Sequence, residues 1–304
     1  MRAQLYKLTQ QSEILNRLIW GLVRFRNVII PLETRLKQRF RRTLGYDLRL
    51  DNPQTFNEKI QWLKIHDKTP LHVICSDKYL VREHITERIG ENYLVPLIFH
   101  TKNVKDLVPE KFPDIPVIVK TNHDSGGGTI IRNKYDVDWG LTRKKFKKRL
   151  ALNYDYGKGE WQYRDIVPRI IVEKLLMDET GEVPSDYKMH FFNGELAFTH
   201  VDMDRETDHR RNLYDPDWNF IPCSLLYPNG RQIAKPAVYD EMIRIGNILS
   251  RDFIYVRVDL YVIGKEIFFG ELTFHHGSGN EPFTPPDYDR LFGEKLILPI
   301  EENQ

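Results

Sequence analysis

The stretch VIVKTNHDSGGGTII, residues 117–131, contains two β-branched runs separated by a polar loop. This pattern predicts two antiparallel strands joined by a hairpin-like loop. Lys120 ends the first run, and the loop contains the three consecutive glycines Gly126, Gly127 and Gly128. Backbone amides of such a loop can approach a phosphate group without steric hindrance. A plain hairpin with an exposed lysine explains the same residues, and the loop does not match a Walker A motif.

The composition is that of an ordinary globular protein. The chain has 304 residues, of which 41% are hydrophobic and 29% charged, enough for one large domain or two compact ones. Two cysteines, Cys75 and Cys223, are too few for a disulfide framework or a structural zinc site, which favours a reducing compartment. The sequence shows no uncharged apolar run of about 18 residues and no signal-peptide cleavage pattern. We therefore expect a cytoplasmic protein without a transmembrane helix.

The first 50 residues are strongly basic. Their net charge is +8, whereas the remaining 254 residues carry −6. Apolar residues recur there at helical spacing, at Leu15, Leu18, Ile19, Leu22 and Val23. Such a helix can lie on a polyanionic polymer or on an anionic membrane surface, which would place the protein at the inner face of the membrane. It can also pack against the rest of the protein.

Beyond residue 50, helices come first and strands follow. We expect a helix over 55–68, where Thr55 and Glu58 fit a capping box, and a second over 76–89 that Gly90 ends. We expect residues 96–108 to form an irregular connection. The elements expected after the opening strand pair are a basic helix over 142–152, a strand over 169–176, a hairpin over 186–204 turning at Asn193-Gly194, a helix over 239–252, and two strands over 255–274 turning at Gly264-Lys265. This order predicts an α+β fold.

Charged residues interrupt the predicted strands. They are Lys120, Glu173, Lys188, Arg257, Asp259 and Glu271. An unpaired buried charge is very costly, so these side chains need partners. Asp259 and Glu271 lie on adjacent predicted strands and can converge on Mg²⁺, which binds one or two carboxylates together with substrate phosphates. The lysines and the arginine can face phosphate oxygens, and Ser125 and Thr129 add hydroxyl donors beside the glycines.

The ordered set of motifs resembles the ATP-grasp superfamily, and within it the TupA-like, teichuronopeptide-biosynthesis type of bacterial surface-polysaccharide gene sets. The motifs cover about residues 51–298 and are FNEKIQWLK (56–64), SDKYLVREHI (76–85), VKTNHDSGG (119–127), EWQYRDIVPRIIVEKLL (160–176), DYKMHFFNGE (186–195), RVDLY (257–261) and FGELTFHHGSG (269–279). The resemblance implies an ATP-grasp fold in which two α+β subdomains grip a nucleotide. The implied parts are a basic helical extension over 1–50, an N-terminal helical or substrate subdomain over 51–110, a small lid subdomain over 111–178, and a large subdomain with the metal site over 179–304.

The resemblance also implies roles for individual residues. The implied nucleotide-binding residues are Lys120, the loop Ser125, Gly126, Gly127, Gly128 and Thr129, the adenine-contacting Glu173, Lys174, Leu175 and Leu176, and the phosphate-contacting Lys188, Lys78 and Arg82. The implied Mg²⁺ ligands are Asp259 and Glu271, with Thr273 where many members of the superfamily have asparagine. The implied catalytic residues are Lys188, Arg257, which would stabilise the transferred phosphoryl group, and Gly277, whose neighbouring amides would form an oxyanion site.

The implied activity is ATP-dependent ligation of a carboxylate to an amine through an acyl phosphate, with an amide, ADP and phosphate as products. The expected partners are a small amine such as an amino acid and a uronic-acid-containing capsule or O-antigen polysaccharide or its precursor. One alternative is a glycosyltransferase of surface-polysaccharide biosynthesis, which the short pattern Asp202-Met203-Asp204 suggests weakly. Another is a non-catalytic polyanion-binding protein, against which the retained lysines, carboxylates and Arg257 argue.

Other polar groups allow more than one interpretation. Six of the seven residues 143–149 are Lys or Arg, which fits a solvated helix face or attraction for an acidic polysaccharide. No aromatic stacking platform accompanies them, so nucleic acid is not expected. His275 and His276 lack the spacing of a zinc site, although one of them can act as a base on the amine. His123 can touch substrate or cap the glycine loop, and the residues Asp202, Asp204 and Arg205 can bind the second substrate or lie in an exposed loop.

Overall fold

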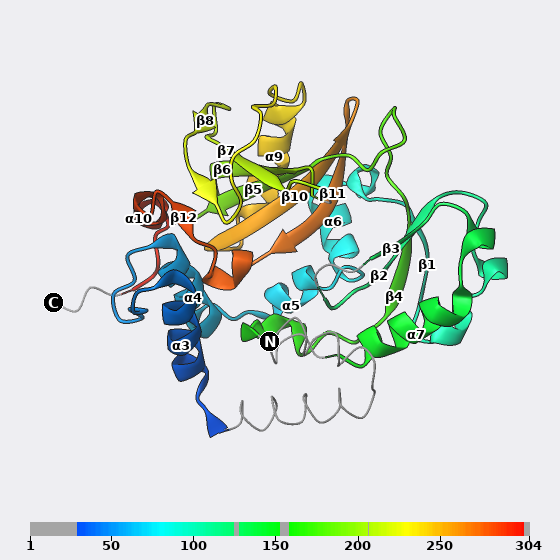
Figure 1. Ribbon diagram of the computed structural model, residues 1–304, viewed down its shortest axis with the longest axis horizontal. Coiled ribbons are helices and arrows are strands. Elements are labelled where there is room, and N and C mark those ends of the chain that lie inside the picture. The colour runs from blue at the N-terminus through cyan, green and yellow to red at the C-terminus, as the bar shows by residue number, and fades with distance from the viewer. Residues whose placement is uncertain (1–28, 125–127, 153–157, 206, 301–304) are drawn as a thin grey trace.

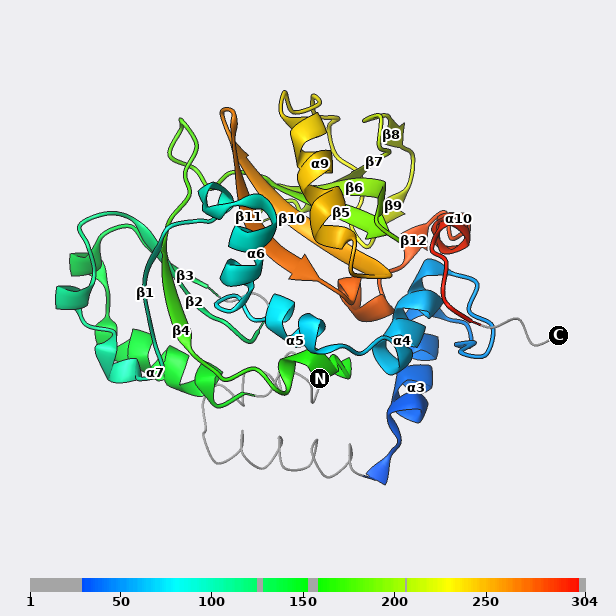
Figure 2. The same ribbon diagram turned by 180° about the vertical axis from the view of Figure 1, so that it is seen from behind.

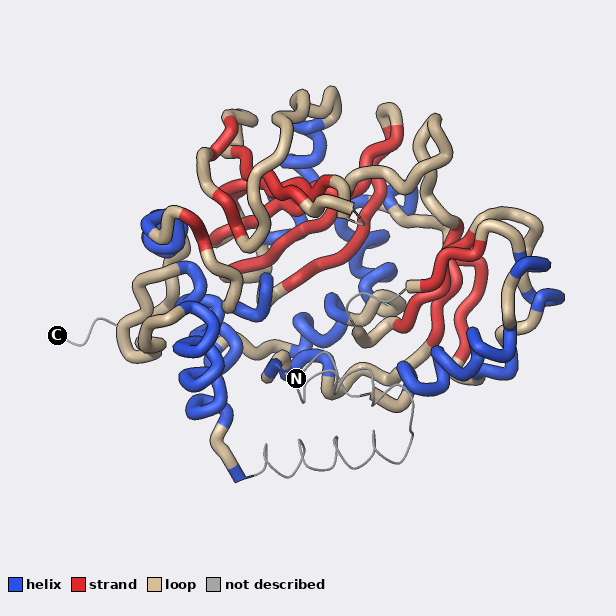
Figure 3. The backbone as a smooth tube through the Cα atoms, viewed as in Figure 1, coloured by secondary structure: helices blue, strands red, loops and turns tan. Residues whose placement is uncertain are grey.

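Two antiparallel sheets dominate the fold, and helices pack around them (Figure 1, and from behind in Figure 2). The computed structural model describes residues 29–124, 128–152, 158–205 and 207–300. The backbone tube shows the two sheets apart from each other, with short helices between them (Figure 3). The predicted α+β class is confirmed. The basic helix expected around residues 15–23 lies outside the described residues.

The small sheet has four strands, each antiparallel to its neighbours. Their spatial order is β1 (Leu97–Thr101), β4 (Ile170–Lys174), β2 (Val117–Thr121) and β3 (Thr129–Ile131). Helix α7 (Trp139–Leu150) buries Phe146 against Val119 and Val172 of this sheet. The β2–β3 pair confirms the two strands expected around the glycine loop.

Strand β1 corrects two expectations. It lies within residues 96–108, where we expected an irregular connection, and it pairs with β4 across a long stretch of sequence. A strand from before residue 111 therefore belongs to the small sheet, and the division predicted at that position does not follow the sheets.

The large sheet has six strands, and a two-stranded sheet lies at its end. In spatial order the six are β11 (Glu266–Thr273), β10 (Tyr255–Ile263), β5 (Asp186–Phe192), β6 (Glu195–Met203), β7 (Arg210–Tyr214) and β8 (Phe220–Ile221), and the pair is β12 (Phe283–Thr284) with β9 (Ser224–Leu225). Both predicted hairpins are confirmed. Asn193, Gly194 and Gly264 have φ of 51°, 88° and 59°, the left-handed conformation that tight hairpin turns require.

The two faces of the large sheet differ in chemistry because successive side chains of a strand point to opposite sides. Met189 and Val258 are cross-strand neighbours on the face that packs against α9 (Tyr239–Ser250) in an apolar core. Lys188 and Asp259, one residue along on the same strands, are also cross-strand neighbours and lie on the opposite face. One face of the sheet is therefore committed to packing, and the other carries charged groups.

Helices pack on one end of the large sheet. α4 (Phe56–His66) begins with the predicted capping box, in which the Thr55 hydroxyl accepts from the Glu58 amide and the Glu58 carboxylate accepts from the Thr55 amide. α10 (Asp287–Lys295) packs on α4, and the added Cβ of a side chain at Gly293 would lie 2.0 Å from the carbonyl oxygen of Gln54. α3 (Leu32–Leu44) packs on the other side of α4.

The remaining helices of the described residues are short. They are α5 (Pro70–Ser76), α6 (Val81–Ile89) and the 3-10 turns Glu91–Tyr93, Val104–Asp106, Pro109–Lys111, Lys134–Asp136, Trp161–Tyr163 and His276–Gly279. The helix expected over 76–89 begins later, at Val81, because the Asp77 side chain accepts from the amides of Tyr79 and Leu80 in a turn before it. Gly90 ends it as predicted. Within the described ranges, no helix is long and apolar enough to cross a membrane.

Candidate functional site

A pocket opens between the two sheets, beside α6. Its lining comes from α6 and the turns around it, from the small sheet and from β11: Lys78, Val81, Arg82, Leu94, Lys120, Glu173, Phe269 and Gly270. Leu94 forms a backbone bridge to Phe269, so the segment after α6 is joined to the edge strand β11. Four residues predicted to contact a nucleotide, from three separate parts of the chain, thus line one pocket.

The centre of the pocket wall is a carboxylate bridged by two cations. Glu173 lies on β4, and its side chain is only 8% exposed. The Lys120 ammonium lies 2.7 Å from one oxygen, and Arg82 Nη1 donates to the other at 3.2 Å. Lys120 is on β2, next to β4, and its side chain is 27% exposed. The two cations hold the Glu173 carboxylate in place, and all three residues belong to the pocket wall.

Polar contacts hold both ends of the glycine loop. Lys78 donates to the carbonyl of Asp124, whose carboxylate pairs with Arg149 of α7. At the other end the Thr129 hydroxyl accepts from Lys145 at 2.7 Å. Ser125, Gly126 and Gly127 lie outside the described residues. The basic face of α7 is therefore not purely solvated, since two of its cations contact residues that flank the loop.

Two further loop residues have structural partners. An added Cβ at Gly128 would lie 3.2 Å from the Ile118 side chain, which favours a residue without a side chain here. His123 is buried, and its Nε2 lies 3.1 Å from the carbonyl of Leu152. This contact joins His123 to the chain just after α7, and both roles considered for His123 remain predictions.

Three residues predicted to contact adenine, Lys174, Leu175 and Leu176, follow Glu173 of the pocket wall. The Lys174 amide donates to the carbonyl of Pro96, and the Leu175 amide donates to that of Pro116. Leu175 is buried, while Leu176 is partly exposed. Within the part of the chain that the structure describes, the Leu176 amide has no backbone acceptor.

The two predicted metal ligands are direct cross-strand partners. Asp259 of β10 lies opposite Glu271 of β11, and the register shifts just after this pair. Gly270 precedes Glu271, and a side chain there would come within 3.0 Å of the Asp259 carbonyl oxygen. The close approach of the two strands therefore places both carboxylates on one short stretch of the sheet.

Arg257 ties the two carboxylates together. Its Nε and Nη2 donate to the two oxygens of Asp259, each at 2.6 Å, and Nη2 also donates to Glu271 at 3.0 Å. Burial raises the pKa of Glu271, but the charges of Lys78, Arg257 and Lys188 outweigh it and hold that pKa below its ordinary value. Glu271 is therefore ionised at neutral pH.

Lys188 completes the cationic side of this group. It lies on β5 opposite Asp259, pairs with Asp186 and approaches Asp259 to 3.5 Å. Burial lowers the pKa of Lys188 to about 8, against the opposing effect of Asp259. Lys188 thus remains mostly an ammonium near neutral pH.

The donor set fits a magnesium ion. Thr273 donates its hydroxyl to Glu271 Oε1 at 3.2 Å, so three predicted ligands present hard oxygen atoms in one place. The Glu271 side chain is 34% exposed, whereas that of Asp259 is 5% exposed. Arg257 already engages both oxygens of Asp259 and one of Glu271, so an ion bound here must share these carboxylates with the guanidinium.

The charged group continues across the polar face of the sheet. Asp186 also pairs with Arg205, which reaches Asp202 of β6 at 2.8 Å. Asp202 lies opposite Arg211 of β7 and accepts from its Nε at 2.6 Å. Despite burial, Arg211 holds the pKa of Asp202 well below its ordinary value. Asp204, by contrast, is exposed and has a left-handed backbone.

Glu281 and His276 close this network back onto Arg257. Arg211 Nη1 donates to Glu281 at 2.8 Å, and His276 Nε2 lies 3.0 Å from the same carboxylate. The other nitrogen of His276, Nδ1, accepts from Arg257 Nη1 at 2.9 Å. His276 is thus fixed between an arginine and a carboxylate.

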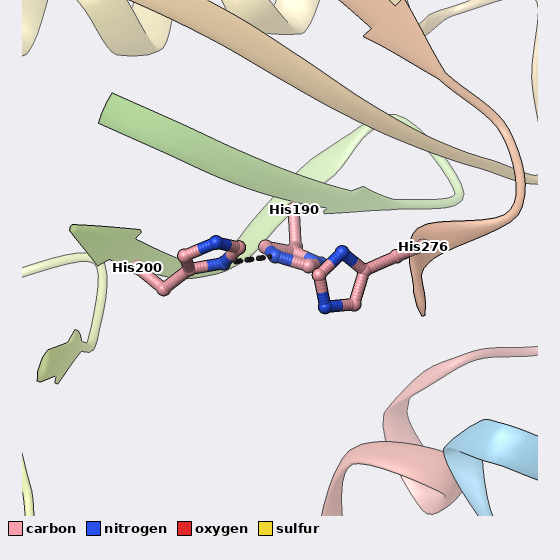
Figure 4. Close-up of side chains that lie close together, drawn as sticks. All are labelled: His190, His200 and His276. Carbon is pink, nitrogen blue, oxygen red and sulfur yellow. Dashed lines mark hydrogen bonds between the residues drawn. The ribbon is translucent and has the colours of Figure 1, made fainter. Parts of the chain in front are cut away.

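Three histidines, His190 of β5, His200 of β6 and His276 after β11, lie close together, as Figure 4 shows. The ring nitrogens of His190, His200 and His276 approach one another within 4.8 Å, and all three residues are buried. His190 Nε2 and His200 Nδ1 share a hydrogen bond of 2.8 Å, and Tyr255 reaches His190 Nδ1 at 3.0 Å. Burial holds the pKa values of His190 and His200 well below 6.5, so both are neutral.

This histidine group is better described as a hydrogen-bonded cluster than as a metal centre. The His276 nitrogen that accepts from Arg257 is occupied by a permanent cation, and its other nitrogen faces Glu281. A metal ion bound through either nitrogen would have to displace one of these partners. The cluster therefore carries polar character deep into the sheet face without titrating near neutral pH.

The segment after β11 turns sharply. Gly277, Ser278 and Gly279 have φ of 53°, 57° and 59°, three successive left-handed residues. An added Cβ at Gly277 would lie 2.4 Å from the Glu281 side chain. Gly277, predicted to form an oxyanion site, is thus held between His276 and Glu281, close to Arg257.

Several polar residues of this region escaped the sequence analysis. Arg211, Glu281, His190 and His200 were not singled out, because the polar residues of one sheet face come from strands far apart in the chain. The alternation of polar and apolar residues in DYKMH (186–190) and RVDL (257–260) was an available signal. The buried polar residues Asn57, Gln61 and Lys64 of α4 were also missed.

Comparison with protein families matches residues 58–297 to the family described as TupA-like ATPgrasp. The match covers well over half of the chain. The chain belongs to the TupA-like ATP-grasp family. The resemblance drawn from the motifs is therefore confirmed, and with it the ATP-grasp fold. No curated protein matches the chain.

Solved structures of ATP-grasp enzymes show distant likeness. D-alanine–D-alanine ligase from Bacillus anthracis, complexed with ATP, is 15% identical, with a TM-score of 0.39 over 66% of this chain and 54% of the ligase. The Helicobacter pylori enzyme of the same name is 13% identical, with a TM-score of 0.40 over 81% and 67%. The ATP-grasp ligase PsnB, complexed with a precursor variant, Mg and ADP, is 10% identical, with a TM-score of 0.38 over 67% and 52%. This chain thus spans about half the length of the Bacillus enzyme and PsnB.

Proposed function

We propose that this ATP-grasp protein is an ATP-dependent carboxylate–amine ligase. The observation that carries the proposal is the placement of two charged groups on facing parts of the fold. Lys120, Arg82 and Glu173 line a pocket against β11, and Asp259, Glu271 and Arg257 lie on β10 and β11. A nucleotide bound in the pocket can direct its phosphates from the first group toward the second.

Each group has a distinct task in this proposal. Glu173 and the Leu176 amide contact adenine, while Lys120 and the loop before Thr129 contact the phosphates. Asp259 and Glu271, with Thr273, would hold Mg²⁺, which neutralises phosphate charge. Arg257 and Lys188 face the phosphoryl group that is transferred.

The chemistry then follows from carboxylate activation. A carboxylate oxygen of the acid attacks the γ-phosphorus of ATP, and ADP leaves. The amine nitrogen attacks the carbonyl carbon of the acyl phosphate, phosphate leaves, and the nitrogen loses a proton. Amides beside Gly277 stabilise the oxyanion formed in the second step. Water has to be excluded from the site, because it would otherwise hydrolyse the intermediate.

We further propose an amino acid as the amine and a uronic-acid-containing polysaccharide or precursor as the acid, on the basis of the family's type. The basic segment 1–50 is proposed to bring the protein to such an acidic polymer or to the inner face of the membrane. The glycosyltransferase alternative gains no support from the D-x-D pattern. Both oxygens of Asp202 already pair with arginines, and Asp204 is exposed away from it.

The test is ADP release with ATP and Mg²⁺ against a matrix of uronic acids and amino acids. Lys120→Met and Glu271→Gln should abolish turnover. Their matched controls are Lys144→Met, at an exposed lysine of α7, and Glu266→Gln, at an exposed carboxylate of the same strand as Glu271, and both should retain it. Release of ADP only when an acid and an amine are both present supports the ligase. No turnover and no thermal shift with ATP–Mg²⁺ contradict the nucleotide site.

A further inference from the structure

Helix α4 carries a buried polar stripe that the proposed chemistry does not use. Asn57, Gln61 and Lys64 recur at helical spacing on one side of the helix, and their exposed fractions are 2%, 0% and 0%. Burial of three polar side chains, one of them a lysine, is costly unless each has partners. The partners of this stripe therefore indicate what it does.

Two of the three residues donate to the left-handed turn after β11. Gln61 Nε2 donates to the carbonyls of Ser278 and Gly279, at 2.9 and 2.7 Å. Lys64 Nζ donates to the carbonyl of Ser278 at 2.8 Å and to its hydroxyl at 2.6 Å. The turn thus presents its carbonyls to α4.

The third residue holds the end of the same segment. Asn57 Nδ2 donates to the carbonyl of Glu281 at 2.9 Å and to Asp289 of α10 at 3.0 Å. Gly279 is pressed against the helix, since an added Cβ would lie 3.0 Å from the Asn57 carbonyl and 2.8 Å from Gln61 Nε2. Each of the three residues of the stripe therefore contacts the segment that follows β11.

The turn needs such support. Left-handed backbone is unfavourable for residues with a side chain, and Ser278 adopts it between two glycines that do the same. Hydrogen bonds from a helix can hold this conformation. The ends of the segment carry His276, which accepts from Arg257, and Glu281, which pairs with His276 and Arg211.

We propose that Asn57, Gln61 and Lys64 are positioning residues that fix the 276–281 segment and, through His276, the guanidinium of Arg257. The inference rests on the proposed function, because Arg257 matters only where a phosphoryl group is transferred. It assigns a task to the FNEKIQWLK motif, whose helix contributes no residue to the lining of the nucleotide pocket. None of the three residues touches the reacting atoms in this proposal.

The proton of Lys64 adds a readout. Burial lowers the pKa of Lys64 to about 7, Glu160 opposes this, and Arg39 of α3 and Lys158 reinforce it. His275, the titratable residue just before the turn, is neutral because burial and the charge of Lys64 hold its pKa well below 6.5. The neutral amine keeps two donors, enough for the carbonyl and the hydroxyl of Ser278, and it buries no charge. Opening of the turn would return Lys64 to water and raise its pKa, so the turn should be held more firmly as pH rises through about 7.

The variants are Lys64→Met and Gln61→Met, with Lys59→Met as the matched control. Lys59 belongs to the same helix and also donates to a backbone carbonyl, that of Leu296 at 2.7 Å, but not to the turn. Gln61→Met removes two hydrogen bonds without burying a charge, so it serves if Lys64→Met folds poorly. Hydrogen exchange of the 275–281 segment, ATP–Mg²⁺ affinity, and kcat and KM in the ligase assay are measured for each folded variant.

We expect faster exchange in 275–281 for Lys64→Met and Gln61→Met, and wild-type exchange for Lys59→Met. We expect kcat to fall about 10- to 100-fold, as for a small misplacement of a catalytic group, while ATP–Mg²⁺ affinity changes less than about threefold because the pocket is unaltered. The ratio of wild-type to Lys64→Met kcat should increase from pH 6 to pH 8, because deprotonation of Lys64 strengthens the hold on the turn.

Three results would overturn the inference: unchanged exchange in 275–281, an unchanged kcat, or equal losses in Lys59→Met. Equal losses of kcat and of ATP–Mg²⁺ affinity would also overturn it, since they indicate a general structural role. Absence of turnover in the wild-type protein would instead contradict the proposed function. The exchange measurement still decides whether α4 sets the turn in that case.

Discussion

Replacement of Arg257 by methionine removes a group that bonds both predicted metal ligands. Four hydrogen bonds are lost: two to Asp259, one to Glu271 and one to His276. Among the described residues, the cation that stays near the buried Asp259 is then Lys188, at 3.5 Å. Breaking a buried ion pair by removing one partner costs about 3–5 kcal/mol.

This cost converts to a melting temperature. The entropy of unfolding of a chain this size is roughly 0.6 kcal/mol/K, from about 2.1 cal/mol/K per residue. We therefore expect Arg257→Met to lower Tm by about 5–8 °C in the absence of Mg²⁺. Arg210→Met is the matched control. Arg210 is a strand arginine paired with the exposed Asp208, and such surface pairs contribute about 0–1 kcal/mol.

Magnesium provides the second half of this prediction. Without the guanidinium, the carboxylates of Asp259 and Glu271 lose the positive charge that Arg257 places between them, so they are free to bind Mg²⁺. Mg²⁺ should therefore raise the Tm of Arg257→Met more than that of the wild-type protein. Differential scanning fluorimetry with and without Mg²⁺ measures both effects. A Tm like that of Arg210→Met would refute the assigned pairing. An equal response to Mg²⁺ in wild type and variant would refute the assigned metal site.

Three further predictions follow from the same contacts. Gly279→Ala should destabilise the protein by clearly more than Gly264→Ala, although both glycines have φ of 59°. The added methyl group would clash with α4 at Gly279, whereas Gly264 has open space around it. Urea denaturation measures the difference, and equal losses of unfolding free energy would refute the packing of the turn on α4. The folded-state pKa of Lys64 is lowered to about 7, so the unfolded chain binds more protons than the folded protein between about pH 7 and 10.5. The free energy of unfolding should therefore rise with pH in this range, by at most about 1.4 kcal/mol per pH unit. Lys64→Met should lack this part of the rise, and identical pH slopes for wild type and variant would refute the assignment. Lys120→Met should weaken ATP–Mg²⁺ binding at least about tenfold by calorimetry, as expected for a lost charge-assisted contact to phosphate, and unchanged affinity would exclude Lys120 from the pocket's function.

Features set by local sequence were predicted well. The Asn193-Gly194 turn fixed the β5–β6 hairpin, and the turn at Gly264 fixed β10 and β11. Once the second hairpin was in register, Asp259 had to lie near Glu271, so the closeness of the two predicted metal ligands followed from turn chemistry alone. The capping box at Thr55 and Glu58 was likewise readable from four residues.

Features that depend on distant partners were not predicted. β1 pairs with β4, which lies much later in the chain. The sequence of residues 97–101 does not indicate this partner strand. The three histidines come from β5, β6 and the turn after β11, and their meeting depends on strand order. Sequence reasoning described only the apolar face of α4, because a polar stripe on a helix normally faces solvent; here it faces a turn of the chain's C-terminal part instead.

The most direct test of the central claim follows one oxygen atom. With the acid identified by ADP release and labelled with ¹⁸O in its carboxylate, the inorganic phosphate produced in the presence of the amine is analysed by mass spectrometry. The account predicts one ¹⁸O in each phosphate, because the carboxylate oxygen that attacks the γ-phosphorus leaves with it. Unlabelled phosphate alongside amide product would contradict the acyl-phosphate route and, with it, the proposed task of Arg257.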